Sequence, residues 1–163
     1  MAAGLGVNMY ADLWSFALST YARPGIEAAC LRLQAQGADV CLLLCGAWLE
    51  RRGVALTAER LQALKQLAGP WQAQVVEPLR QVRMQWRSMA QQDELLAGLR
   101  ERVKALELDA ERVLLTRLQA LAHTWPSAEV MSQQRWLERL AAEDAANLDH
   151  DALQQLRVAA TGT

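Results

Sequence analysis

Three arginines stand at helical spacing in the middle of the chain, in the stretch EPLRQVRMQWR. Arg80, Arg83 and Arg87 are three and four residues apart, so a helix would place them along one face. A row of guanidinium groups can make paired hydrogen bonds to phosphates or carboxylates. The plainer interpretation is a solvated face opposite an apolar stripe, which is what most charge rows are. The row is nevertheless the leading candidate for partner binding, to an acidic protein surface or to RNA.

A second candidate is the cysteine pair in VCLLLCGAWL. Cys41 and Cys45 are four residues apart and would share a helix face, where they could contribute two ligands to a metal. A structural zinc needs four ligands, and Cys30, His123 and His150 form no second spaced pair. Free cysteine among leucines behaves as a small apolar side chain. We therefore expect inert core thiols, and predict neither a metal site nor a cofactor.

Sequence patterns of known catalytic sites are missing. There is no His-Glu-x-x-His, no Gly-x-Ser-x-Gly and no phosphate-binding loop. The carboxylates of Glu107, Asp109 and Glu111 lack the Glu-x-x-His pairs of a di-iron bundle. We therefore predict that the protein is not an enzyme. An enzyme of another type would need polar residues such as Tyr21, Glu27 and Asp12 to converge in a cleft.

Helices must position these residues, because helical periodicity dominates and strand signals are almost absent. We predict an all-α fold, a compact array of seven or eight helices around a buried central helix at about residues 39–52. Asp39 is a natural N-cap for that helix and Gly53 a natural stop. Its apolar residues occupy every face, which is typical of a helix at the centre of a core.

Prolines and the length of one segment set the expected breaks. Gly69-Pro70 should end the fourth helix, and Pro78 should kink or interrupt the fifth. After residue 91 we expect one long helix or a broken pair, over about Gln92–His123, with an apolar seam. Unbroken, it would be roughly 45–50 Å long at 1.5 Å per residue, so it must project, cross the bundle or break near Asp109. Its seam can pack on its own domain or on a second copy, so a homodimer is one of the partner predictions.

The totals exclude some classes of function. The 163 residues, 52% hydrophobic and 21% charged, suit one helical domain over 1–163, with 160–163 a frayed tail. A net charge of −1 gives no general attraction to nucleic acid or anionic membranes. The uncharged run over 40–49 is short of the about 20 residues of a membrane span. The first basic residue is Arg23 and there are three cysteines, so we expect neither a secretory signal nor a disulfide framework, and predict a cytoplasmic protein.

One longer pattern runs through the first half of the chain. It consists of Trp-x-Phe-Ala-Leu, a Tyr followed by Pro-Gly, Leu-x-Leu-Gln, Asp-Val before a leucine-rich run ending in Trp-Leu, and Pro-Leu-Arg-x-x-Arg. The residues that carry it are Trp14, Phe16, Tyr21, Pro24, Gly25, Leu33, Gln34, Asp39, Val40, Trp48, Pro78, Leu79, Arg80 and Arg83. Over about residues 10–90 the chain resembles a family of short, uncharacterised proteobacterial proteins. The resemblance implies a bacterial, soluble, cytoplasmic protein and supplies no catalytic or binding residue.

Two hypotheses follow. The first is a non-enzymatic interaction or regulatory protein that binds a partner, most simply a protein, through Arg80, Arg83 and Arg87. The second is a helical bundle that binds an apolar small molecule in a tryptophan-lined pocket, since such pockets are mostly apolar and often lie between helices. The tryptophans that would line it are Trp14, Trp48, Trp71, Trp86, Trp125 and Trp136.

Overall fold

The computed structural model describes residues 12–127, 135–141 and 149–161, and the fold is all-α, as predicted. The helices are α1 (Leu13–Tyr21), α2 (Ile26–Ala35), α3 (Val40–Arg51), α4 (Ala58–Trp71), α5 (Glu77–Gln85), α6 (Arg87–Ala90), α7 (Glu94–Ala122), α8 (Trp136–Ala141) and α9 (His150–Thr161), with a π-helical turn, η1 (Gln72–Val76), between α4 and α5. Residues 162–163, the end of the tail predicted to fray, lie outside the described residues.

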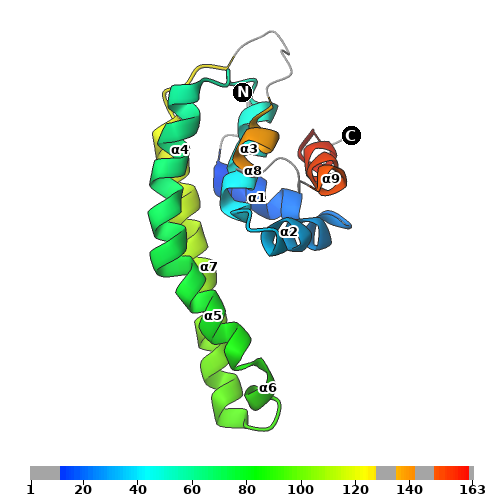
Figure 1. Cartoon of the computed structure of the whole chain (residues 1–163), viewed down its shortest axis with the longest axis vertical. Coiled ribbons are helices and arrows are strands. Elements are labelled where there is room, and N and C mark those ends of the chain that lie inside the picture. The colour runs from blue at the N-terminus through cyan, green and yellow to red at the C-terminus, as the bar shows by residue number, and fades with distance from the viewer. Residues whose placement is uncertain (1–11, 128–134, 142–148, 162–163) are drawn as a thin grey trace, which may run out of the picture.

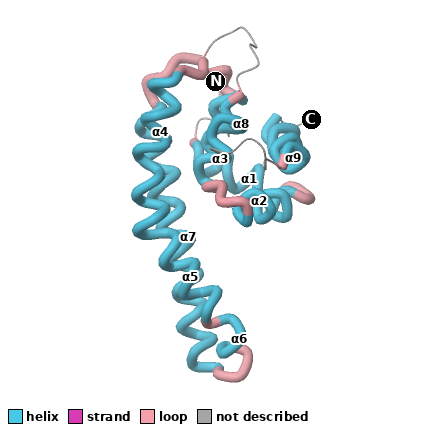
Figure 2. The backbone as a smooth tube through the Cα atoms, viewed as in Figure 1, coloured by secondary structure: helices cyan, strands magenta, loops and turns pink. Residues whose placement is uncertain are grey.

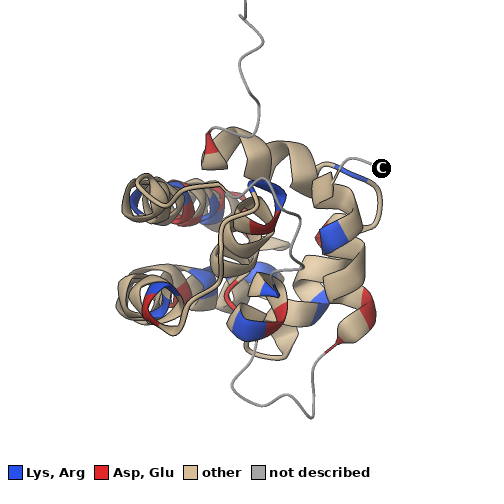
Figure 3. Cartoon of the chain, turned by 90° about the horizontal axis from the view of Figure 1, so that it is seen from above, with Lys and Arg blue, Asp and Glu red and all other residues tan. Residues whose placement is uncertain are grey.

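The helices form two parts of different shape (Figure 1). We call α1, α2, α3, α8 and α9 the body. The succession α4–η1–α5 runs antiparallel to α7 along one side of it, and the short α6 lies near the turn that joins them (Figure 2). The far end of this helical pair, made of α5, α6 and the first half of α7, projects beyond the body, and we call it the arm. Seen from above, the two long helical rods lie side by side next to the body (Figure 3).

Helix α3 lies at the centre of the core, as its sequence predicts. Residues 41–49 are all buried. Asp39 caps the helix, because its Oδ1 accepts from the backbone N–H of Cys41 at 2.9 Å. Gly53 follows the helix with φ 67°, the left-handed conformation that favours glycine. A Cβ at Gly46 would lie 2.9 Å from Cδ1 of Leu140, so glycine allows α8 to pack closely on α3.

The break expected at Gly69-Pro70 is wrong. Helix α4 continues through Pro70 to Trp71, and the irregularity follows it, as η1. In η1 the N–H of Glu77 donates to the carbonyl of Gln72, five residues back. In a regular α-helix the ring of Pro78 would clash with the carbonyl of the residue four positions earlier. That residue lies within η1, where the helix is wider. The prolines therefore produce a bulge in a long rod, and the rod supports one side of the arm.

Helix α7 is continuous, and Asp109 lies inside it without breaking it. The expected seam divides into two faces. Ala110, Leu114 and Leu118 are buried, whereas Leu99 and Leu106 are about half exposed. The C-terminal helix α9 extends through Thr161, so the tail predicted to fray from residue 160 is helical at 160–161. Within the described residues, no helix has both the length and the apolar character that a bilayer span requires.

Candidate functional site: a cleft between the body and the arm

A cleft of about 710 Å³ lies between α1, α2 and α3 on one side and α5, α6 and α7 on the other. Its apolar lining includes Trp14, Leu18, Leu31, Val40, Leu44, Leu108 and Leu115. Its charged lining consists of Arg80, Arg83, Arg87, Lys104, Glu27, Glu107 and Glu111. All three arginines of the predicted row therefore border one concave site, although their surroundings differ greatly.

Arg80 lies at the base of the cleft and is only 9% exposed. Its Nε donates to Oε1 of Glu107 at 3.3 Å, and its Nη1 donates to Oε2 of Glu77 at 3.0 Å. With the Gln34 amide turned so that its oxygen faces the arginine, Nη2 donates to it at 2.9 Å. These contacts link α2, α5 and α7. Arg80 is therefore a structural ion, not part of a solvated charge row.

Arg83, one turn further along α5, shares the same acidic partner. Its Nε and Nη2 donate to Oε2 and Oε1 of Glu107, the second at 3.3 Å. This pairing raises the pKa of Arg83, which keeps it charged. The backbone carbonyl of Arg83 also accepts from Nε of Arg100 at 2.9 Å. Glu107 thus shares one negative charge between two arginines, and Nη1 of Arg83 makes no hydrogen bond to another described residue.

Arg87 begins α6 and is exposed at the rim of the cleft. It makes no hydrogen bond or ion pair with any other residue that the structure describes. Across the cleft on α7, Lys104 is also exposed and has a loose contact of 3.6 Å to Glu101. The three arginines therefore differ in exposure and in pairing. Arg80 is buried and paired, whereas Arg87 is exposed and could contact a ligand.

Glu111 is a half-buried carboxylate on the cleft wall. Burial, together with the charge of Glu107, raises its pKa to about 7, although Arg80 and Arg83 oppose the shift. Its side chain makes no hydrogen bond within the described part of the chain. At neutral pH the Glu111 carboxyl group is therefore divided between its protonated and ionised forms.

Tyr21 and Glu27 also reach the cleft, so two of the three polar residues considered for convergence come together there. Burial, helped by the nearby charges of Glu27 and Glu111, raises the pKa of Tyr21 to about 12, so it stays neutral. Asp12 does not join them. It caps α1, where its Oδ1 accepts from the N–H of Trp14 at 3.1 Å.

Sequence reasoning missed the acidic side of this site. In the sequence, Glu107 and Glu111 suggest only metal ligands, and nothing singles out Lys104. A usable signal was present, because Lys104, Glu107, Glu111 and Leu115 are spaced three or four residues apart and so share a face of one helix. The sequence does not indicate that this face would meet the arginines of α5.

The tryptophans do not form a common pocket. Trp14 lines the cleft, but Trp48 and Trp136 are fully buried in the core. Trp71 and Trp125 pack on the outside of that core, and Trp125 stacks on Trp136 with ring centroids 6.2 Å apart. Trp86 is half-buried at the end of α5 and does not line the cleft. Trp14 is therefore the one tryptophan of the six that lines the cleft, and the tryptophan-lined pocket does not describe this site.

The three cysteines are free and buried. Burial raises the pKa of Cys30 to about 11 and that of Cys45 to about 12, and it raises the pKa of Cys41 as well. Such thiols stay protonated and are poor nucleophiles. Among the described residues, no three His, Cys, Asp or Glu side chains are grouped so that they could hold a metal ion.

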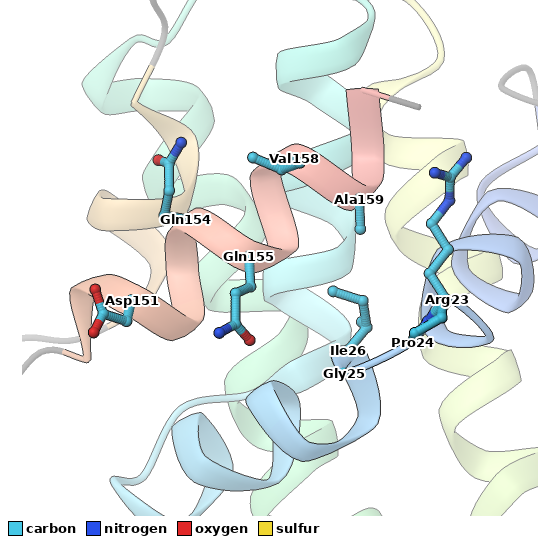
Figure 4. Close-up of a pocket in the computed structure, with 9 residues that line it drawn as sticks. All are labelled: Arg23, Pro24, Gly25, Ile26, Asp151, Gln154, Gln155, Val158 and Ala159. Atoms are coloured by element: carbon cyan, nitrogen blue, oxygen red, sulfur yellow. The ribbon is translucent and has the colours of Figure 1, made fainter. Parts of the chain in front are cut away.

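A second hollow, of about 640 Å³, lies between the start of α2 and the face of α9 (Figure 4). Its polar side chains come from its edges, and Arg23 and Asp151 lie at opposite ends of it. Gln155 and Ile26 face the space between the two helices. Because these groups do not converge, this hollow offers no combination of charge and apolar surface comparable with the cleft.

A family model described as a protein of unknown function, DUF2390, matches residues 12–118. The chain belongs to this family. The matched span contains every residue that lines the cleft, from Trp14 to Leu115, and it extends beyond the region of about 10–90 in which the resemblance was seen. It therefore includes Glu107 and Glu111, on the opposite wall from the arginines. No curated protein and no solved structure matches the chain.

Proposed function

We propose that the protein is a binding protein whose cleft takes a small organic anion with an apolar body. One observation carries this proposal: the same cleft combines free or partly free cations, Arg87, Lys104 and Nη1 of Arg83, with an apolar wall. The acid group of the ligand would meet these cations, and its apolar part would cover the exposed leucines.

The apolar wall supports this choice of ligand. Leu18, Leu31 and Leu108 are each about half exposed, although they come from three different helices that face one hollow. Covering such side chains is favourable by about 25 cal/mol for each Å² removed from water. A volume of about 710 Å³ lies within the usual range for small-molecule sites.

The distribution of charge favours a small anion over RNA or an extended acidic protein surface. Arg80 is already paired, and Glu107 accepts two of the hydrogen bonds that Arg83 can donate. Glu27 and Glu111 add negative charge to the lining. A polyanion would be repelled by these carboxylates, whereas a single acid group can reach the cations at the rim.

The three cysteines support a reducing compartment, because all are free thiols. Our proposal therefore places the protein in the bacterial cytoplasm. It assigns binding without conversion of the ligand, since no described nucleophile is activated: the thiols are protonated and the pKa of Tyr21 is about 12.

The proposal is tested by calorimetric titration with two probes of equal length, decanoate and decanol. We expect decanoate to bind about tenfold more tightly, because only the carboxylate can pair with the rim cations. Equal affinities, or no binding of either probe, would contradict a site for amphipathic anions.

Two matched variants locate the binding. Leu31→Asp places a carboxylate on the cleft wall, and Val158→Asp makes the same change at an exposed apolar residue of α9 outside the cleft. We expect the first to weaken decanoate binding by about tenfold and the second to leave it within about twofold. Equal effects of the two substitutions would place decanoate somewhere else on the surface.

A further inference from the structure

Six residues of α7 form a stripe that does not contribute to the core or to the cleft. We call it the outer stripe, and it consists of Leu95, Leu99, Arg102, Leu106, Asp109 and Val113. Their spacings of 4, 3, 4, 3 and 4 residues keep them within an arc of roughly 80° on a helix with 100° per residue. The stripe is roughly 27 Å long at 1.5 Å per residue.

The outer stripe faces away from the rest of the molecule. Lys104, Leu108 and Glu111, which line the cleft, lie on the opposite side of α7, about 180° around the helix. Its four apolar members are all exposed, from 38% at Val113 to 85% at Leu95. Exposed apolar side chains aligned along one helix face form a candidate interaction surface.

The two charged members make this stripe self-complementary. Arg102 lies four residues before Leu106, and Asp109 lies three residues after it. Both are exposed, and neither makes an ion pair or hydrogen bond with another residue in the described ranges. If a second α7 is laid antiparallel on the first, with a two-fold axis near Leu106, each Arg102 meets Asp109 of the other copy. The same operation lays Leu99 against Val113 of the second copy.

We propose that the outer stripe binds a second copy of this chain, giving a two-fold symmetric dimer with antiparallel α7 helices. Closed two-fold dimers bury the same patch on both subunits, so opposite charges must be placed symmetrically about the axis, as Arg102 and Asp109 are. A different partner protein would require no such symmetry within the patch. The interface leaves both clefts open, because each lies on the far side of its own α7.

Charge reversal tests this geometry directly, with sedimentation velocity over a range of protein concentrations. Arg102→Asp makes both charged positions of a copy acidic, and Asp109→Arg makes both basic. We expect each single variant to dissociate about tenfold more readily than the wild-type protein, since both cross-axis pairs become repulsive. A mixture of the two variants should form a heterodimer, because every cross-axis pair is then opposite in charge. The double variant R102D/D109R should dimerise like the wild-type protein.

Control variants separate this surface from others. Glu101→Lys changes the charge of α7 by the same amount as a reversal, but lies about 120° away from the stripe, and should leave dimerisation unchanged. Leu106→Asp should give a monomer whose helical circular dichroism and melting temperature match those of the charge-reversal variants at concentrations where these have dissociated, because Leu106 is exposed. A wild-type protein that stays monomeric throughout the micromolar range, or a dimer that neither the reversals nor their mixture affects, would overturn the proposal.

Discussion

Two clusters of ion pairs hold helices together in this protein, and they differ in what surrounds them. In the first cluster, Arg157 of α9 bonds to Glu50 of α3 at 2.9 Å and to Glu138 of α8 at 2.7 Å. In the second, Glu107 of α7 bonds to Arg80 and Arg83 of α5. The Arg157 cluster joins three helices of the body and borders neither hollow. The Glu107 cluster joins α5 to α7 within the arm, reaches α2 of the body through the contact of Arg80 with Gln34, and forms part of the cleft.

The two clusters also differ in how completely their charged groups are paired. Arg157 makes hydrogen bonds to both of its carboxylates, which raise its pKa and help to lower that of Glu138. Around Glu107, by contrast, the side chain of the neighbouring Glu111 makes no hydrogen bond to another described residue, and its pKa is raised to about 7. A closed ion cluster is typical of structure, whereas leftover charge beside a cleft indicates a place for a ligand.

The largest expected effect is on stability, from Glu107→Ala. The substitution leaves the buried guanidinium of Arg80 without its partner on α7, and Arg83 loses the same carboxylate. We expect the free energy of unfolding, measured by urea denaturation, to fall by about 3 kcal/mol. Removing one partner of a buried ion pair leaves the other charge desolvated without a compensating interaction. Glu107→Gln keeps an acceptor oxygen and should lose less. If both variants unfold like the wild-type protein, the ion pairs between α5 and α7 do not stabilise the fold.

Arg157→Ala makes the corresponding change in the body. Glu50 and Glu138 then face each other without a cation, but Arg157 is more exposed than Arg80 and water can partly replace it. We expect a loss of about 2 kcal/mol in the free energy of unfolding and no change in decanoate affinity. Parallel denaturation and calorimetry would check both statements. Weaker decanoate binding at unchanged stability would remove the distinction between the two clusters.

Local chemistry made much of the fold predictable. Asp39 and Gly53 bound α3 as expected, and Thr57 caps α4 by accepting from the N–H of Arg60 at 3.1 Å. A cap needs only residues within one turn, so a short sequence window contains the whole interaction. The same holds for α3, whose apolar residues on every face require burial whatever surrounds them.

The parts that were wrong or missed depend on distant partners. Arg80 has the spacing of a solvated arginine row, but its partner Glu107 lies 27 residues away on another helix. Leu99 and Leu114 belong to one apolar seam in the sequence, yet only Leu114 faces a partner helix. Helix α4 persists through Pro70, and the irregularity lies in η1, close to the kink that Pro78 predicts and not at Gly69-Pro70. Periodicity gives the faces of a helix, and tertiary packing decides which face is covered.

Glu111→Gln tests the difference between the two ion clusters through the pH dependence of the free energy of unfolding. The pKa of Glu111 is raised from about 4.5 to about 7 on folding, so the folded protein binds a proton that the unfolded chain has already released between these values. The free energy of unfolding should therefore fall as pH rises through that window. We expect Glu111→Gln to lose this part of the pH dependence and to be about 2 kcal/mol more stable than the wild-type protein at pH 8. Thermal melts between pH 5 and pH 8 would measure it.

Asp39 provides the internal reference for that experiment. Burial raises its pKa to about 6, so it contributes a change of the same sign at lower pH, which Glu111→Gln should retain. Decanoate binding should also weaken as pH rises through about 7, because ionised Glu111 adds negative charge to the cleft. A variant that keeps the full wild-type pH dependence of both properties would show that Glu111 is not the titrating group.

The smallest effect on stability is expected from Arg87→Ala, and it separates the binding role of the cleft from its structural role. Arg87 is exposed and has no partner among the described residues, so its removal should change the free energy of unfolding by no more than about 0.5 kcal/mol. Decanoate affinity should nevertheless fall by about fivefold, since a free cation at the rim is lost, while decanol affinity should stay the same. Calorimetry with both probes on the variant and on the wild-type protein measures this difference. An equal loss for both probes would mean that Arg87 contributes apolar contact through its stem, and an unchanged decanoate affinity would leave Lys104 and Arg83 as the cations that meet the acid group.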